Sequence, residues 1–264
     1  MNIHVYRDLD AQGKAAASLF AAQILKKPDS VLGFATGSTP LRTYAALADL
    51  CAQGALDFSR VHTFNLDEYV GMAREHEQSY FNFMYTNLFS KVNIPTENYR
   101  LPNGLAADID RECAEYEAAI EAAGGIDLQF LGIGHDGHIG FNEPCGEFPK
   151  ATHCVELNPI TIEANKRFFA SADEVPRRAL SMGIGTIMRA RGVVLVIYGA
   201  DKAEITAKAL KGPVTPEVPA SILQFHPSCT VLLDEATGIV NLFFKDSATG
   251  ENGVFDPGSN SVGG

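Results

Sequence analysis

Short apolar runs alternate along the chain with longer segments in which apolar residues recur at helical spacing. The apolar runs predict buried strands at Ile3–Tyr6, Val31–Ala35, Val61–Leu66, Ile126–Gly132, Val193–Tyr198 and Thr230–Leu233. The longer segments predict helices at Asp10–Lys27, Pro40–Gln53, Ser79–Phe89, Asp108–Ala123, Asp201–Lys211 and Ala220–Phe225. This alternation is typical of a doubly wound α/β fold, in which a mostly parallel sheet carries helices on both faces.

The same pattern indicates one domain followed by a short tail. No segment repeats another, and no linker is long enough to separate two domains, so residues 1–249 are expected to form a single Rossmann-like α/β domain. Residues 250–264 are rich in Gly, Asn and Ser, and we expect them to form a flexible C-terminal tail.

Charge and composition narrow the classes of partner. The 264 residues carry a formal net charge of −11, and an acidic surface repels nucleic acid and anionic membranes, so neither is expected as a partner. Five scattered cysteines without a CxxC pair are not typical of a disulfide framework or a zinc module. The sequence shows neither a secretory signal nor an apolar run of membrane-spanning length, which predicts a cytoplasmic protein.

The segment Thr36-Gly-Ser-Thr-Pro40 follows one predicted strand and opens the next helix. Gly37 lets the backbone approach a ligand, Ser38 and Thr39 add hydroxyl groups, and the start of the helix presents free N–H groups. Such a segment can hold a phosphate group without the lysine of a Walker motif. An ordinary strand-to-helix turn with a capping hydroxyl looks the same, so both interpretations stay open for this segment alone.

Asp67 closes the predicted strand Val61–Leu66 and is followed by Glu68. A carboxylate at this end of a strand can face a ligand pocket. Partial burial and the neighbouring Glu68 would both raise the pKa of Asp67, which suits a general base. The alternative is that one of these two acids caps the next segment and is solvated.

The loop Gly132-Ile-Gly-His-Asp-Gly-His-Ile-Gly-Phe-Asn-Glu-Pro144 gives the strongest chemical signal. Its four glycines, Gly137 among them, remove side chains that would crowd a bound molecule. His138 carries a side chain whose ordinary pKa lies near neutrality, and Asp136 and Glu143 could orient it and hold its charge. This combination after a strand predicts acid–base chemistry.

Two other interpretations of this loop are weaker. Residues 132–137 match G-x-G-x-x-G, but a dinucleotide site also needs a helix at this point, and further glycines with Pro144 argue against one. The loop's acids and histidines could ligate a metal, but their spacing fits no standard zinc pattern. No metal and no cofactor is therefore expected.

Basic residues are few, so isolated ones near the predicted strand ends stand out. Lys202 follows the strand Val193–Tyr198, and Arg167 lies in the stretch Asn165-Lys-Arg-Phe-Phe169. Either side chain could pair with a phosphate group, Arg167 as a bidentate fork. An exposed solvating charge is the alternative for each.

Taken together, these motifs resemble the motif set of the glucosamine-6-phosphate deaminase (isomerase) family. The resemblance is carried in order by Phe34-Ala-Thr-Gly-Ser-Thr-Pro40, Phe64-Asn-Leu-Asp-Glu-Tyr69, the loop 132–144, Asn165-Lys-Arg-Phe-Phe169 and Lys202. It covers nearly the whole chain, from about Ile3 to Leu233. The Asp-Gly-His-Ile-Gly-Phe-Asn-Glu-Pro run is its most specific part.

The resemblance implies a role for each site residue. Asp67 matches the base that moves a proton from C2 to C1 of the opened sugar, and His138 matches the group that opens the pyranose ring. Asp136 and Glu143 match the acids that support it. The residues implied to bind substrate and its phosphate are Thr36, Gly37, Ser38, Thr39, Gly137, Arg167 and Lys202.

The implied reaction converts D-glucosamine 6-phosphate and water to D-fructose 6-phosphate and ammonia. The same superfamily leaves two alternatives, a 6-phosphogluconolactonase, which needs no C2 base, and a non-catalytic sugar-phosphate sensor domain. Some family members are hexamers activated by N-acetylglucosamine 6-phosphate. The stretch Cys145–Val155 offers only Lys150 and His153 as basic residues, so this activation is not expected, and assembly into a homo-oligomer is left open.

Overall fold

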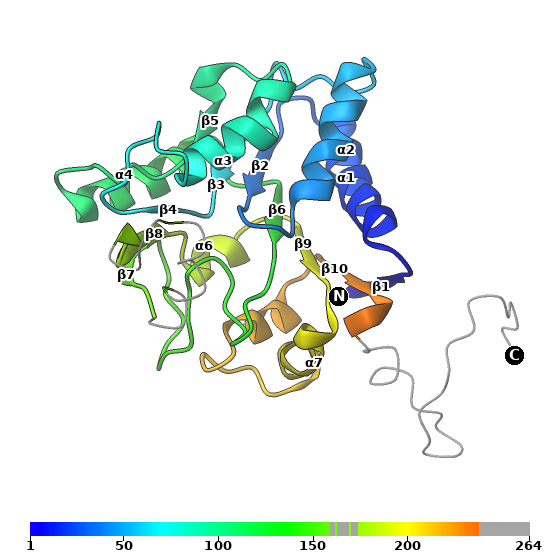
Figure 1. The fold of residues 1–264 in the computed structure, drawn as a ribbon, viewed down its shortest axis with the longest axis vertical. Helices are drawn as coiled ribbons and strands as arrows, with labels where there is room; N and C mark the ends of the chain where they lie inside the picture. Colours follow the sequence, from blue (N-terminus) through cyan, green and yellow to red (C-terminus); the bar gives the residue numbers. More distant parts are fainter. Residues whose placement is uncertain (159–161, 163–168, 170–173, 238–264) are drawn as a thin grey trace, which may run out of the picture.

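A seven-stranded sheet forms the centre of the computed structural model, which describes residues 1–158, 162, 169 and 174–237 (Figure 1). The strands lie in the order β1-β10-β9-β6-β2-β3-β5, and every neighbouring pair is parallel. They span β1 (Asn2–Tyr6), β2 (Val31–Phe34), β3 (His62–Asn65), β5 (Tyr99–Arg100), β6 (Leu128–Leu131), β9 (Val193–Ile197) and β10 (Cys229–Asp234). The central strands β2 and β9 are buried throughout, as their continuous apolar sequences predict.

Helices cover both faces of this sheet, which confirms the predicted doubly wound arrangement. The helices are α1 (Leu9–Lys26), α2 (Leu41–Ala52), α3 (Tyr80–Asn87), α4 (Ile109–Ala122), α6 (Ile184–Met188) and α7 (Ala203–Lys211). The short 3-10 helices are η1 (Phe89–Lys91), η2 (Thr96–Asn98), η5 (Ala200–Lys202), η6 (Pro219–Phe225) and η7 (Glu235–Thr237). The chain crosses the sheet in one direction from β1 through β2 to β3 and in the opposite direction from β9 to β10. Right-handed crossovers therefore put α1 and α2 on one face and α7 on the other (Figure 1).

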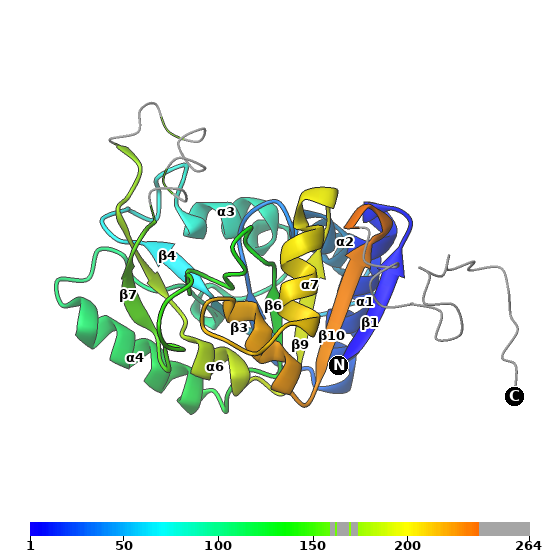
Figure 2. The ribbon, with the colours of Figure 1, turned by 90° about the horizontal axis from the view of Figure 1, so that it is seen from below.

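A second, antiparallel sheet of three strands lies beside the first. It has the order β4-β8-β7, with β4 (Asp67–Tyr69) paired to β8 (Arg178–Ser181) and β8 paired to β7 (His153–Glu156). Figures 1 and 2 both place it on the side of the molecule away from β1 and β10. A small apolar cluster of Tyr69, Met72, Phe141, Leu157 and Ala179 packs around it.

The sequence pattern predicted the parallel sheet but not this smaller one. Each of the six predicted strands overlaps a strand of the large sheet, and only the short edge strand β5 was missed there. The pattern gave no strand for β4, β7 or β8 and no helix for α6. Their residues do not form long apolar runs, because β7 is only partly buried and β8 begins with the exposed Arg178. The short helix predicted at residues 220–225 is present as the 3-10 helix η6.

Two buried polar side chains fix the carboxyl ends of the central strands. The hydroxyl of Tyr44 in α2 donates to the carbonyl of Ala35 (2.6 Å) and accepts from the N–H of the same residue (3.2 Å), just after β2 ends. The amide of Gln12 in α1 donates to the carbonyls of Ile197 (2.7 Å) and Leu232 (2.9 Å), in β9 and β10. Because these backbone groups are satisfied by rigid helices, the loops that follow the strands start from fixed positions.

No helix in the described ranges is long and apolar enough to cross a membrane. The predicted tail, residues 250–264, lies outside the described residues, which end at Thr237. The domain boundary at residue 249 therefore stays a prediction.

Candidate active site

A cavity of about 500 Å³ opens at the carboxyl ends of β2, β3 and β6. It is lined by Ala35, Thr36, Gly37, Thr39, Leu66, Asp67, Tyr80, Gly132, Ile133, Gly134, His135, Asp136, His138, Gly140 and Phe141. The three segments that the sequence singled out, 36–40, 67–69 and 135–144, all contribute to its wall. Their convergence follows from the parallel sheet, because the carboxyl ends of neighbouring strands meet at one edge.

The segment after β2 forms one end of the cavity. Gly37 has a φ of 91°, a left-handed conformation that favours glycine, and no side chain caps the start of α2 at Pro40. Thr36 and Thr39 line the cavity. Ser38 does not, and its Oγ accepts a hydrogen bond from the hydroxyl of Tyr198 at 2.8 Å. This segment therefore presents its backbone and the side chains of Thr36 and Thr39 to the cavity.

Asp67 lies at the first position of β4, opposite Ser181 of β8. Its side chain is buried, with the residue 6 % exposed, and its Oδ1 has no hydrogen-bond partner among the described residues. Burial first, and then the negative charge of Glu68, raise the pKa of Asp67 to about 8. The prediction of a raised pKa agrees with this environment, and the alternative of a solvated cap is wrong for Asp67.

His138 and Asp136 form a close pair on the facing loop. Nδ1 of His138 lies 2.7 Å from Oδ1 of Asp136, and the same oxygen accepts the backbone N–H of His138 at 3.1 Å. Partial burial alone would raise the pKa of Asp136, but the hydrogen bonds and charge of His138 outweigh it and lower that pKa to about 2. Asp136 is therefore held ionised beside the imidazole, at a position from which it could orient the ring.

Glycine makes the fold of this loop possible. A Cβ at Gly134 would overlap the ring of His138, and Gly137 has a φ of 90° with a Cβ position only 2.8 Å from Val218. A Cβ at Gly140 would lie 3.1 Å from Oγ of Ser181 and 3.8 Å from Oδ2 of Asp67. The close approach of the loop to the His138 ring and to β4 depends on these missing side chains.

Three other predicted residues do not line this cavity, and one cannot be placed. Gly137 is buried in the loop, and Glu143 accepts the backbone N–H of Asn158 at 3.4 Å. Lys202 donates to the carbonyl of Ile133 at 3.1 Å, and Ile133 does line the cavity. Burial lowers the pKa of Lys202, while Asp201 and Asp136 act in the opposite direction. Arg167 lies outside the described residues.

The aromatic part of the wall was not predicted from the sequence. The rings of Tyr80 and Phe141 stack at 6.1 Å with an interplanar angle of 9°. Phe141 belongs to the glycine-rich loop, so its sequence position was a usable signal, whereas nothing in the helical pattern of Ser79–Phe89 singled out Tyr80. His135 also lines the cavity, and its Nε2 lies 2.7 Å from Oδ2 of Asp201.

The alternatives for the loop find no support in its geometry. No helix begins between β6 and β7, so the G-x-G-x-x-G match lacks the helix that a dinucleotide site requires. Within the described residues, no group of three or more His, Cys, Asp and Glu side chains is arranged to hold a metal ion. The site instead presents a buried carboxyl, an acid–imidazole pair and a polar segment after β2 around one cavity.

This arrangement agrees with a comparison to known protein families. The family model described as glucosamine-6-phosphate isomerases/6-phosphogluconolactonase matches residues 9–232. The chain belongs to this family. Its members include the curated glucosamine-6-phosphate deaminase of Thermoanaerobacter pseudethanolicus, 49 % identical over 91 % of this chain and 95 % of that protein. The glucosamine-6-phosphate deaminase of Lachnoclostridium phytofermentans is 54 % identical over 88 % of this chain and 97 % of that protein.

Solved structures of the family share the fold. A structure described as a monomeric glucosamine-6-phosphate deaminase superposes with a TM-score of 0.88 at 41 % identity, covering 90 % of this chain and 99 % of that one. The 6-phosphogluconolactonase of Thermotoga maritima superposes with a TM-score of 0.69 at 22 % identity, covering 88 % of this chain and 98 % of that one. At such low identity the second likeness shows the fold alone.

Proposed function

We propose that the protein is a glucosamine-6-phosphate deaminase, which converts D-glucosamine 6-phosphate and water to D-fructose 6-phosphate and ammonia. One observation carries the proposal. A buried carboxyl with a pKa of about 8 shares a cavity with an acid–imidazole pair. The relatives that are 49 % and 54 % identical over most of their length and bear this name support it.

The first chemical step is opening of the sugar ring. His138 takes the proton from the hydroxyl on C1 and delivers a proton to the ring oxygen, so that the C1 aldehyde forms as the ring bond breaks. Asp136, 2.7 Å from Nδ1, holds the ring orientation and stabilises the imidazolium form. Glu143, which the sequence assigned to the same task, belongs to this proposal as a supporting acid.

The second step is transfer of a proton along the open chain. Asp67 takes the proton from C2, which leaves an enol that carries the amino group, and returns a proton to C1. The result is the imine of fructose 6-phosphate, and water adds at C2 as ammonia leaves. Because its pKa of about 8 lies near working pH, Asp67 can both accept and return the proton.

Binding of the phosphate group positions C1 and C2 between the two acid–base groups. We assign this task to Thr36, Gly37, Ser38 and Thr39 together with Lys202, whose ammonium group reaches the loop at Ile133, and to Arg167. Binding energy from this remote group is used to orient the reacting atoms. We also propose a cytoplasmic location. One related structure is described as a monomeric deaminase, so no oligomeric assembly is assigned.

Product analysis tests the proposal. Glucosamine 6-phosphate should yield ammonia and fructose 6-phosphate in equal amounts, and in deuterated water the product should carry deuterium at C1. The protein should not hydrolyse 6-phosphogluconolactone above the uncatalysed rate. Lactone hydrolysis without ammonia release would replace the proposal by the lactonase alternative. Binding of the phosphosugar without either reaction would favour the sensor alternative.

A further inference from the structure

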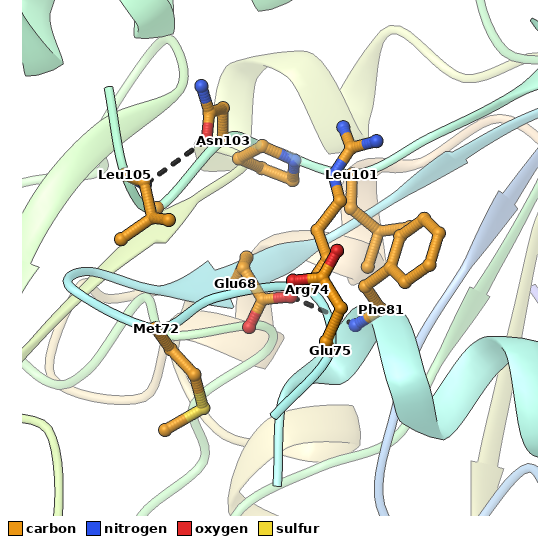
Figure 3. A pocket seen from close by; sticks show the side chains of 10 residues that line it. Glu68, Met72, Arg74, Glu75, Phe81, Leu101, Asn103 and Leu105 are labelled. Carbon is orange, nitrogen blue, oxygen red and sulfur yellow. Dashed lines mark hydrogen bonds between the residues drawn. The ribbon is translucent and has the colours of Figure 1, made fainter. Parts of the chain in front are cut away.

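Glu68, next to the proposed base, is a buried acid to which the mechanism above gives no task. The residue is 3 % exposed. Neighbouring side chains of a strand point to opposite faces, so Asp67 and Glu68 leave β4 in opposite directions. Accordingly Asp67 lines the large cavity, whereas Glu68 lines a separate cavity of about 160 Å³ together with Arg74, Phe81 and Asn103 (Figure 3).

The carboxylate of Glu68 is held by three backbone N–H groups. Its Oε1 accepts from Tyr69 at 2.9 Å and from Tyr80 at 3.0 Å, and its Oε2 accepts from Phe81 at 2.9 Å. Tyr80 and Phe81 are the first two residues of α3, whose N–H groups have no partner inside the helix. Figure 3 shows Glu68 directed at this helix start, with its bond to Phe81 drawn. Glu68 thus caps α3 from a different element of the fold.

This cap connects the two parts of the large cavity that carry the base and the aromatic wall. Tyr80 lines the cavity and stacks on Phe141, and its hydroxyl donates to that of Tyr69 at 3.1 Å. Glu68 therefore fixes the position of the Tyr80 wall relative to the strand that carries Asp67.

The charged surroundings of Asp67 single out the same residue. Tyr44 of α2, Tyr80 of α3 and Tyr116 of α4 interact with Asp67, but burial raises the pKa of each well above its usual range, so they stay neutral. His138 lines the same cavity as Asp67. Glu68 is the group whose charge adds to burial in raising the pKa of Asp67.

The environment of Glu68 itself combines opposing effects. Burial raises the pKa of Glu68 above its usual value, and its three N–H bonds and the charge of Arg74 reduce this rise without reversing it. Arg74 is placed by Phe81, since its Cζ lies 4.9 Å from the centre of that ring. The capping bonds and this cation favour the ionised carboxylate.

We propose that Glu68 is a positioning residue for the reaction: its carboxylate holds β4 and the start of α3 in one arrangement and keeps a negative charge beside Asp67. The inference rests on the proposed function, since it assigns Glu68 to the base of that reaction. Two substitutions probe its two tasks. Glu68→Gln keeps the length of the side chain but removes the charge and one of the two accepting oxygens, whereas Glu68→Asp keeps the charge and shortens the reach to α3.

The charge is tested by the pH profile of kcat/KM for ammonia release. In Glu68→Gln the half-maximal point of the acid limb should move to lower pH by on the order of one unit, because the repelling charge is gone. Glu75→Gln is the matched control, because Glu75 lines the same small cavity but is exposed and makes no bond to α3 among the described residues; its limb should not move. A Glu68→Gln limb that coincides with that of the wild type overturns the proposal, since a merely structural role lowers the rate without moving the limb.

The cap is tested by amide hydrogen exchange. In the wild type, the N–H groups of Tyr80 and Phe81 should exchange slowly although they lie in the first turn of a helix, and in Glu68→Asp both should exchange at least tenfold faster. Fast exchange in the wild type contradicts the cap without the need for any variant. Equal exchange in Glu68→Asp contradicts it as well.

A spectroscopic titration separates this inference from the proposed function. The infrared band of the protonated Asp67 carboxyl, assigned by its absence in Asp67→Asn, reports the proton affinity of Asp67 without any substrate. A shift of this titration in Glu68→Gln supports the effect of Glu68 even if glucosamine 6-phosphate is not turned over, which would refute the proposed function alone. An unshifted titration refutes the inference even if the deamination assay succeeds.

Discussion

Two walls of one cavity carry the same side chain in opposite electrostatic states. On the β4 wall, burial and Glu68 raise the pKa of Asp67 to about 8, and on the facing loop His138 brings the pKa of Asp136 to about 2. Asp67 is 6 % exposed with an unpartnered oxygen, whereas the Asp136 side chain is 39 % exposed and lies 2.7 Å from the imidazole. Solvent access and the nearest charge, not residue type, decide which carboxyl can exchange a proton.

This difference in pKa also gives the two acids different tasks in the site. A carboxyl that is protonated near neutral pH can act as a proton carrier, and one that is always ionised can only orient and stabilise a neighbour. If this division is correct, removing the charge of Asp67 should lower the reaction rate. Removing the charge of either Asp67 or Asp136 should also change the free energy of unfolding, with opposite dependence on pH for the two acids.

The largest effect is expected from Asp67→Asn. The amide cannot take up the C2 proton, so kcat for ammonia release should fall by about 10³-fold, within the usual range for loss of a general base. KM should change little, because the phosphate-binding segments are untouched. Steady-state kinetics with glucosamine 6-phosphate measures both quantities. A variant that keeps its kcat within tenfold of the wild type would show that Asp67 is not the base.

The same substitution should stabilise the fold at neutral and higher pH. The folded-state pKa of Asp67, about 8, lies above its ordinary value of 3.8, so its contribution to stability is complete below about pH 4 and is lost as pH rises through 8. The free energy of unfolding of Asp67→Asn relative to the wild type should therefore grow with pH over this range. Each pKa unit is worth about 1.4 kcal/mol, and after relaxation of the site we expect a gain of roughly 2–4 kcal/mol at pH 8.

Urea unfolding at several pH values between 4 and 8 checks this dependence. The comparison between variant and wild type cancels the titration of groups that both share. A difference that stays constant across this range would mean that Asp67 is ionised in the folded protein, and the contrast between the two walls would disappear.

The sequence predicted most of the large sheet and the loop segments that line the cavity, for a physical reason. Buried parallel strands need continuous apolar runs. Val193–Ile197 is such a run, and a fully buried strand is the simplest interpretation of its β-branched sequence. Chemistry at the strand ends needs polar residues and glycine, which interrupt these runs visibly at Thr36 and Gly132. Both signals are local in sequence, so composition and spacing were enough to find them.

The sequence indicated a raised pKa for Asp67 but not the strand pairing that buries it. The strand β4 has three residues and pairs with β8, more than 100 positions later in the chain. Ser181 of β8 also accepts the N–H of Phe141 at 2.9 Å and so ties the loop to the same sheet. Neither pairing has a periodic signature. The burial of Asp67 and the cap that Glu68 forms on α3 depend on contacts between distant segments, which no local pattern encodes.

Lys202 does not line either wall, and its substitution should affect substrate binding rather than the chemical steps. Lys202→Ala removes the ammonium group that donates to Ile133 and is proposed to bind the phosphate. We expect KM for glucosamine 6-phosphate to rise by about tenfold with a smaller change in kcat, because loss of one charged contact costs on the order of 1–2 kcal/mol. A variant that binds the phosphosugar normally would remove Lys202 from the site. A tenfold fall in kcat at constant KM would instead connect it to the loop of His138.

The smallest effect is expected for the stability of Asp136→Asn, with the opposite pH dependence to Asp67→Asn. The folded-state pKa of Asp136 is lowered from 3.8 to about 2, so its stabilising contribution is present above about pH 4 and is lost as pH falls through 2. Because the side chain is 39 % exposed, solvent screening limits the loss in the variant to less than about 1 kcal/mol at pH 7. The difference should shrink below about pH 4 and vanish only when unfolding is measured below pH 2. Asp201→Asn is the matched control, since Asp201 makes the same 2.7 Å contact to His135 with both side chains largely exposed, and its stability should not change measurably. If the two variants lose equal stability, partial burial contributes nothing to the Asp136–His138 pair, and the low pKa of Asp136 would follow from proximity to an imidazole alone.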